Sequence, residues 1–217
     1  MRRFAVTAAA ALGLAACTTF EGSVDNPIER SLTWFSYVAG EDIRAACTAD
    51  SSDRYRFVYN AVYERQIRAY ELRLDADGAD QTSRARNNAG NFVNFEFRNP
   101  LSPWELRRSD VRLTSADAAA IVDGLAKDVA AAPASAGQRL RSNRFYWAVA
   151  ACQSGTFRLH AFEQDKVELE SLAFRGPLLA HDKTEVNFVE AEQIEGFSDN
   201  AFEIRINRTG NGIAGQF

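Results

Sequence analysis

Two strand-like stretches flank a tight turn in residues 145–162, FYWAVAACQSGTFRLHAF. The first runs from Phe145 to Cys152 and is apolar throughout, and the second, from Thr156 to Phe162, alternates apolar with polar side chains. Aromatic and β-branched residues in such runs predict strands. Between them, Gln153-Ser154-Gly155 forms a three-residue turn in which glycine accommodates a positive φ. This stretch therefore predicts an antiparallel hairpin.

The same alternation occurs upstream. Aromatic and aliphatic residues alternate with polar ones in residues 54–59 and again in 70–75, and one side of residues 92–97 is wholly apolar. A period of two predicts three further strands. Residues 60–69 are ambiguous, because their aromatic spacing suits a helix as well. Further strand candidates are residues 104–113 with a bulge near Arg108 and Ser109, 167–174, 185–191 and 202–207.

Two regions carry strong helix signals. Asn26-Pro27 suits the cap and first position of a helix that Gly40 ends. A second helix begins at Thr114 or Ser115, carries an apolar stripe with helical spacing and cannot continue through Pro133. The remaining local expectations are a short helix over residues 41–47, a polar loop over 79–91, a break at Gly176-Pro177 and a frayed, glycine-rich end over 209–215.

These elements predict a single domain of the α+β class over residues 26–217. Its length is in the usual range for one domain. Several short strands and few helices favour a mainly antiparallel β-sheet, either a sandwich or a curled sheet that forms half a barrel. We expect the N-terminal helix to precede the sheet and the helix after Thr114 to pack on it.

The first seventeen residues are of a different kind. Arg2 and Arg3 precede an apolar run of small residues, and Leu14-Ala15-Ala16-Cys17 closes it. The run is too short for a permanent membrane span and is typical of an export signal. Its last four residues resemble the lipobox of bacterial lipoproteins.

The resemblance implies a set of processing steps and a location. Residues 1–16 would be a signal peptide that is removed, Cys17 would carry acyl chains, and residues 17–25 would form a short tether. Two or three acyl chains anchor a protein stably, because each buried methylene contributes about 0.8 kcal/mol. Thr18 stands where lipoproteins of the inner membrane typically carry Asp, so the resemblance implies the outer membrane, facing the periplasm. The alternative is an ordinary secretory signal with Cys17 incidental.

The number of cysteines also bears on whether Cys17 carries lipid. The chain has three cysteines, and an odd number in an exported protein leaves one to be explained. If Cys17 carries lipid, Cys47 and Cys152 are left to form a disulfide in an oxidising compartment. The alternative is that both are buried and unpaired.

The net charge of the chain indicates which classes of partner it can bind. Without Arg2 and Arg3 the chain keeps 23 basic residues against 29 acidic ones, a net charge of −6. An acidic domain disfavours nucleic acid and polybasic attachment to anionic lipid. We therefore expect no nucleic-acid partner, and contact with the membrane through the lipid anchor.

No catalytic motif stands out, and we expect no cofactor. The sequence has two histidines, and neither His-x-x-x-His nor Cys-x-x-Cys occurs, so no metal site is predicted. His160 lies in a predicted strand and is interpreted as structural, and His181-Asp182-Lys183 as a surface turn. Glu168 and Glu170 would share a strand face, where a solvated acidic face explains them.

One constellation suggests a binding surface for anions, glycans or a partner protein. Arginine grips carboxylate or phosphate with paired hydrogen bonds, and tyrosine offers flat apolar area with a polar tip. The alternative is cross-strand pairing of these side chains with nearby glutamates. The members are Arg54, Tyr55, Arg56, Tyr59, Tyr63, Arg65, Arg68 and Tyr70, with Arg84 and Arg86 as a continuation.

Two classes of function remain. The first is a membrane-anchored envelope lipoprotein with a non-enzymatic binding or structural role, which would engage an envelope protein or glycan. The alternative is a periplasmic small-ligand carrier or hydrolase with a cavity inside the curled sheet, which requires a deep apolar pocket with convergent polar groups.

Overall fold

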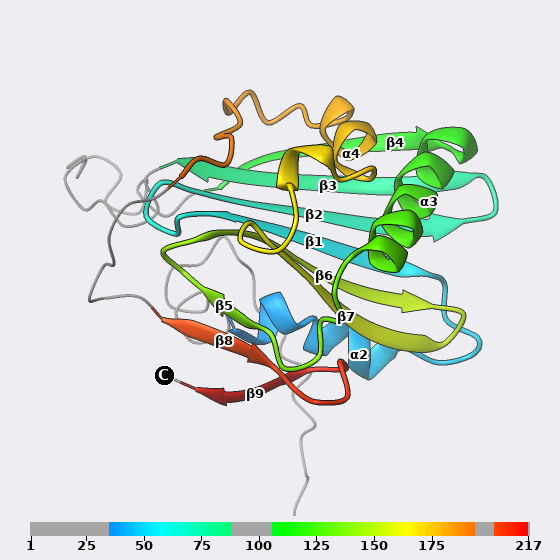
Figure 1. Cartoon of the computed structure of the whole chain (residues 1–217). Helices are drawn as coiled ribbons and strands as arrows, with labels where there is room; N and C mark the ends of the chain where they lie inside the picture. Colours follow the sequence, from blue (N-terminus) through cyan, green and yellow to red (C-terminus); the bar gives the residue numbers. More distant parts are fainter. Residues whose placement is uncertain (1–34, 88–105, 194–201, 217) are drawn as a thin grey trace, which may run out of the picture.

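The computed structural model describes residues 35–87, 106–193 and 202–216. Its main feature is a curled, open sheet of six antiparallel strands in the order β4-β3-β2-β1-β6-β7 (Figure 1). The predicted α+β class with a curled antiparallel sheet is therefore confirmed. The strands are β1 (Arg54–Ala61), β2 (Gln66–Asp75), β3 (Gly78–Asn87), β4 (Arg107–Thr114), β6 (Phe145–Gln153) and β7 (Thr156–Glu163).

A second, smaller sheet and several helical segments complete the described elements. The small sheet has the strand order β5-β8-β9. Residues 35–39 are also helical and end at Gly40, as predicted, whereas the predicted start of that helix lies outside the described residues. The bounds are β5 (Arg139–Arg141), β8 (Glu203–Ile206), β9 (Ile213–Gln216), α2 (Glu41–Ala46), α3 (Ser115–Ala131), α4 (Arg175–Ala180) and a 3₁₀ turn, η2 (Leu169–Ser171).

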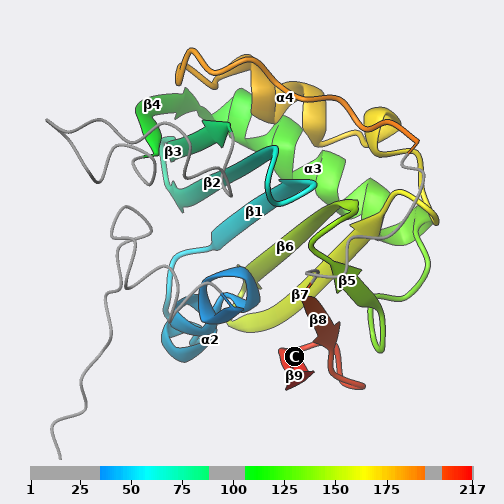
Figure 2. The ribbon, with the colours of Figure 1, turned by 90° about the vertical axis from the view of Figure 1, so that its left-hand side faces the viewer.

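The main sheet is covered unequally on its two faces (Figure 2). On the inner face, α3 crosses the sheet, and Ile121 and Leu125 join a core with strand residues such as Leu72 and Trp147. On the outer face, α2 and the small sheet cover β1, β6 and β7. There Ile43 of α2 forms a second core with buried side chains of these strands and of the small sheet. Ile67 and Ala69 of β2 also join this core, whereas the outer face of β2 from Glu71 onward, with β3 and β4, carries charged side chains.

The turns explain the hairpin geometry. The register pairs Gln153 with Thr156, so the β6–β7 turn has two residues rather than the predicted three. Both of them, Ser154 and Gly155, have positive φ, as a two-residue turn of this kind requires. At the β2–β3 turn, a Cβ on Gly78 would lie 2.2 Å from the Leu113 carbonyl oxygen. Only glycine allows β4 to approach this closely.

Helix α3 begins and ends as its sequence predicts. The Thr114 side chain accepts a hydrogen bond of 3.2 Å from the Asp117 backbone N–H, which caps the helix. The helix ends at Ala131, two residues before Pro133. Gly124 sits against the backbone of residues 173–174, where a Cβ would come within 2.7 Å of the Phe174 nitrogen.

The structure corrects several local predictions. Residues 79–87 belong to strand β3 rather than a loop, residues 167–174 form η2 and turns, and residues 185–191 pair with no described strand. Pro177 lies in the first turn of α4, where a missing N–H costs little. The pairing of β4 with β3 is continuous, so the predicted bulge near Arg108 is absent. Ile213–Gln216 forms β9 within the end expected to fray, and the predicted strand over residues 92–97 lies outside the described residues.

The predicted disulfide between Cys47 and Cys152 is present. It joins the segment after α2 to the end of β6, with 5.7 Å between the two Cα atoms and a sequence separation of 105 residues. Because the bridge closes so long a loop, it removes many conformations from the unfolded chain.

Loss of this bridge is expected to destabilise the domain strongly. The chain-entropy relation for a loop of this length gives about 4 to 5 kcal/mol. A Cys47→Ala/Cys152→Ala variant should therefore show a lower free energy of unfolding in urea. Dithiothreitol should lower the wild-type value to a similar extent and leave the double variant unchanged. An equal midpoint for wild type and variant would contradict the prediction.

Candidate functional site

The predicted arginine and tyrosine segment divides between the two faces of the sheet. On β1, Tyr55 and Tyr59 belong to the inner core and are each 1% exposed. Arg54 and Arg56 lie on the outer face, where both pair with Asp42 of α2. Successive side chains of a strand point to opposite faces, so these residues do not form one surface. The tyrosines are not exposed, contrary to the prediction.

The remaining members also separate. Arg68 and Tyr70 are buried on the inner face of β2. Arg65 lies in the β1–β2 turn, is exposed and pairs with Glu192. The ring of Tyr63 packs edge-on against Phe202 at 5.0 Å between centroids. On β3, Arg84 pairs with Glu71 at 3.6 Å, and Arg86 is buried on the same outer face.

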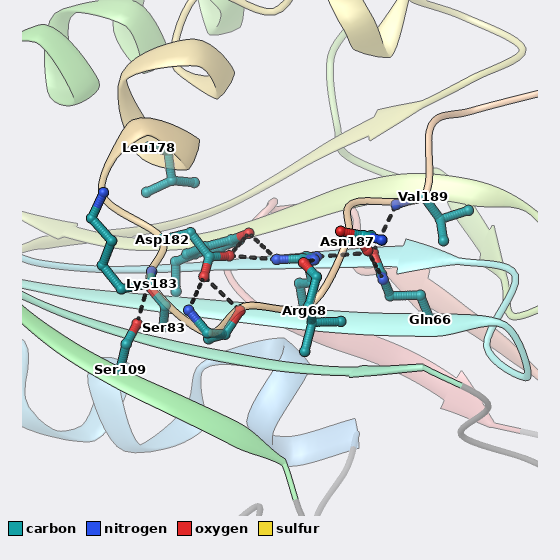
Figure 3. Close-up of polar contacts among 12 residues, drawn as sticks. Gln66, Arg68, Ser83, Ser109, Leu178, Asp182, Lys183, Asn187 and Val189 are labelled. Atoms are coloured by element: carbon teal, nitrogen blue, oxygen red, sulfur yellow. Dashed lines mark hydrogen bonds and ion pairs between the residues drawn. The ribbon is translucent and has the colours of Figure 1, made fainter.

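The inner face holds a buried ion pair between Arg68 and Asp182 (Figure 3). The two side chains are 2% and 7% exposed. Tyr70 donates to the Asp182 carboxylate over 2.8 Å, and the Thr184 hydroxyl and backbone N–H donate over 2.6 and 2.9 Å. Arg68 also donates to the Val186 carbonyl and to Gln66. Each charge therefore has a partner and further hydrogen bonds, as a buried ion pair requires.

This network holds residues 182–192, which we call the strap, across the inner face of β2 and β3 (Figure 3). Gln66 donates to the Asn187 carbonyl over 2.7 Å and accepts from the Val189 N–H over 3.1 Å. The ring of Phe188 stacks on Tyr59 with 4.7 Å between centroids. The strap, α3 and the aromatic side chains thus pack on the inner face, where a carrier would need a cavity.

The hydrogen bonds and the charge of Arg68 also set the ionisation of Asp182. Burial acts to raise its pKa, but the hydrogen bonds from Thr184 and Tyr70 and the positive charge of Arg68 outweigh burial and lower the pKa. His181-Asp182-Lys183 is therefore not a simple surface turn, because its central carboxylate is buried. His181 lies 3.6 Å from Asp117 at the start of α3.

A second ionic network lies on the outer face, around Arg56. Its guanidinium donates to both Asp42 oxygens over 2.7 and 2.8 Å and to Glu71 over 3.2 Å, and it stacks on the Tyr37 ring at 3.9 Å. Burial acts to raise the pKa of Glu71, but the charges of Arg56 and Arg84 outweigh burial and lower it. The predicted alternative, pairing of arginine with a glutamate of the next strand, is what the structure has for Arg56. This network fastens residues 37–42 to the sheet.

Beside this network, the outer face of β2, β3 and β4 forms a hollow of about 410 Å³, which we call the charged hollow. Four arginines and three acidic residues line it, although the whole chain is acidic. Gln81, Thr82 and Val111 complete the lining. The charged members are Arg73, Arg84, Arg108 and Arg112 with Glu71, Asp80 and Asp110.

Most of these charges pair within the hollow or at its margin. Arg112 binds both oxygens of Asp75 over 2.6 Å and reaches Asp80 at 3.2 Å. Its hydrogen bonds lower the pKa of Asp75 to about 2. Arg108 pairs with Asp110 at 3.0 Å. Arg73 is exposed, and within the described ranges no carboxylate lies in ion-pair distance of it. The hollow thus offers a polar, positively biased surface.

The other predicted residues do not add a catalytic set. Burial, followed by the charge of Arg158, lowers the pKa of His160 on β7. Leu169–Ser171 is a 3₁₀ turn, so Glu168 and Glu170 do not share a strand face. In the described part of the chain, no group of three or more potential ligands could hold a metal ion. Cys17, the predicted lipidation site, lies outside the described residues.

The chain was compared with protein-family models, with curated proteins and with solved structures, and none of them matches. Among the described residues, no helix is long and apolar enough to cross a membrane.

Sequence reasoning missed the charged hollow because it assigned residues 79–91 to a loop. The signal was present: residues 80, 82 and 84 are polar, and residues 107–112, RRSDVR, place charges at alternate positions. A strand at residues 78–87 would have aligned these charges on one face. The Arg68–Asp182 pair carries no local signal, because its members are 114 residues apart.

Replacing Asp182 by asparagine is expected to cost about 3 to 5 kcal/mol of unfolding free energy at pH 7, because Arg68 would be buried without a counter-charge. The folded pKa of Asp182 lies below the unfolded value of about 3.9, so its contribution is present above that value and is lost as pH falls through the folded pKa. Urea unfolding of wild type and variant should therefore differ at pH 7, and the difference should shrink only below about pH 4, as pH falls toward the folded pKa of Asp182.

Two comparisons make this test specific. Asp123→Asn on the exposed side of α3 is the matched control and should change stability little. Arg68→Met/Asp182→Leu removes both charges and should be less destabilising than Asp182→Asn. Equal stability of wild type and Asp182→Asn at pH 7 would contradict the structural role of the pair.

Proposed function

We propose that the protein is a lipid-anchored lipoprotein of the bacterial envelope whose domain binds another envelope component without catalysis, through the charged hollow. The lipobox-like residues 14–17 support the anchor, and the Cys47–Cys152 disulfide fits an oxidising compartment. The observation that carries the binding role is the hollow itself: a recessed, charged surface on the sheet face that the described elements leave uncovered at β2, β3 and β4.

The position of the N-terminal segment supports the same proposal. Residues 37–42 lie near the start of the described residues, on the side of the proposed anchor, and they bind the outer face beside the hollow through Arg56 and Arg54. Seventeen residues separate Cys17 from Phe35, and at full extension they span at most about 60 Å. The described chain therefore begins on the same face as the hollow, and a connection of this length would keep the hollow within reach of the membrane surface.

The alternative function, a small-ligand carrier or a hydrolase with a cavity in the curled sheet, draws no support from the inner face. Trp147, Phe174 and Phe188 pack there in a continuous aromatic group, with Trp147 and Phe174 edge to face at 5.4 Å. Gln66, Arg68 and Tyr70 of that face bind the strap. A ligand would have to displace this segment before it could enter.

The anchor can be tested by mass spectrometry of protein from its native host. The expected mature N-terminus is Cys17, with a diacylglycerol on its sulfur and an acyl chain on its amine. A Cys17→Ser variant should keep its signal peptide or lose the acyl chains. An unmodified N-terminus in the wild-type protein would overturn the lipid anchor.

The binding surface can be tested by crosslinking in living cells. A photoreactive amino acid at Thr82, within the charged hollow, is expected to give a specific adduct. The same amino acid at Lys127, exposed on α3, serves as the matched control. Adducts that are absent from both positions, or equal at both, would contradict the assignment of the hollow.

A further inference from the structure

The margin of the charged hollow contains two arginines that face each other across adjacent strands. Arg54 of β1 is the register partner of Arg73 of β2, and both point to the outer face. Side chains at such positions have Cβ atoms about 4.5 to 5.5 Å apart, and like charges there destabilise a sheet. Counter-charges from the chain or an anionic ligand relieve such a repulsion.

The nearby carboxylates are mainly engaged by other arginines. Asp42 lies 3.6 Å from Arg54, but both of its oxygens bind Arg56 at 2.7 and 2.8 Å. Asp80 stands opposite Arg73 in the register, yet its ion pair is with Arg112. Arg54 is only 23% exposed, and burial together with the charge of Arg73 lowers its pKa. The positive charge of Arg73 thus has no carboxylate in ion-pair distance among the described residues, and it lies beside the partly buried charge of Arg54.

A second arginine pair shows which feature matters. Arg139 and Arg205 face each other between β5 and β8, but Arg139 pairs with Glu203 at 3.5 Å, and neither lines the hollow. The Arg54–Arg73 pair differs because Arg73 opens into a recess that can hold a small group. Tyr55, Tyr59 and Tyr70, which would have offered sugars a stacking surface, are buried, so recognition here depends on charge.

We propose that Arg54 and Arg73 bind a phosphate monoester at the edge of the charged hollow, which rests on the function proposed above. A single guanidinium is enough to bind both oxygens of a carboxylate. A phosphate monoester has three acceptor oxygens and a charge of about −1.5 to −2, so it can bind two guanidinium groups. Two neighbouring forks and two positive charges therefore match phosphate better than carboxylate. The group can belong to a lipid headgroup or to a phosphorylated saccharide, and both share this chemistry.

The test is a titration of the mature, full-length protein in detergent with inorganic phosphate at low salt. The Nε–Hε resonances of Arg54 and Arg73 should shift together along a saturable curve for a single site. Arg73→Gln and Arg54→Gln should each weaken binding about tenfold or more, because each removes charge-assisted hydrogen bonds. Arg73→Lys should weaken it less, because it keeps the charge but loses the fork.

Arg205→Gln is the matched control, since it removes an exposed strand arginine that faces another arginine away from the hollow, and it should bind phosphate like wild type. Arg73→Gln should also unfold at the same or a higher temperature than wild type, because it removes a repulsion, so lost binding would not reflect misfolding. Absence of saturable shifts, or an equal loss in Arg205→Gln, would overturn the phosphate site.

The source of the phosphate is assigned by competition between water-soluble dihexanoylphosphatidic acid and glucose 1-phosphate. Tighter binding of the first supports a lipid headgroup, and tighter binding of the second supports a saccharide. The proposed function is tested separately from this site. If wild type binds no phosphate but an adduct at Thr82 forms in wild type and persists in Arg73→Gln, the binding surface is supported and the phosphate site is overturned.

Discussion

The architecture depends on the burial of strand β1 on both of its faces. Seven of its eight residues are buried. Tyr55, Phe57 and Tyr59 lie in one core, and Val58 lies in the other. A strand in this position requires a layer on each side, which α3 and the strap supply inside, and α2 and the small sheet supply outside. Among the described elements, the outer layer does not extend over the whole width of the sheet. The charged hollow lies where it stops, on β2, β3 and β4.

The two ionic networks join parts of the chain that lack backbone pairing to this sheet. Arg68 holds the strap through Asp182, and Arg56 holds residues 37–42 through Asp42 and the Tyr37 carbonyl. In both cases a nearly buried arginine binds a carboxylate on a segment outside the sheet. Replacing both charges of a buried pair by apolar residues often preserves stability, so such pairs are best understood as fixing one arrangement of a segment. This suits a segment such as the strap, whose path no strand pairing determines.

The sequence was sufficient for elements with a strong period and standard boundaries. The β6–β7 hairpin, helix α3 with its Thr114 cap, and the curled antiparallel class followed from alternation, capping and turn residues. Strand β3 did not, because its inner face is partly polar: Gln81 and Ser83 hydrogen-bond with each other instead of packing as an apolar row. The strap could not be predicted either, because its backbone is held by side chains that are distant in sequence. Alternation did separate tyrosine from arginine on β1, but treating them as one surface ignored that period.

The net charge of the whole chain is a poor guide to the charge of the hollow. The negative total disfavours attachment by a broad basic surface, and the acidic residues responsible are spread over the molecule. Folding brings arginines from β1, β2, β3 and β4 to one face, and the carboxylates there are shared: Asp42 serves Arg54 and Arg56, and Glu71 serves Arg56 and Arg84. Shared carboxylates leave a local excess of positive charge within an acidic protein. Screening by salt confines the influence of distant charges to about 8 to 10 Å, so a small anion at Arg73 responds to this local excess and not to the total.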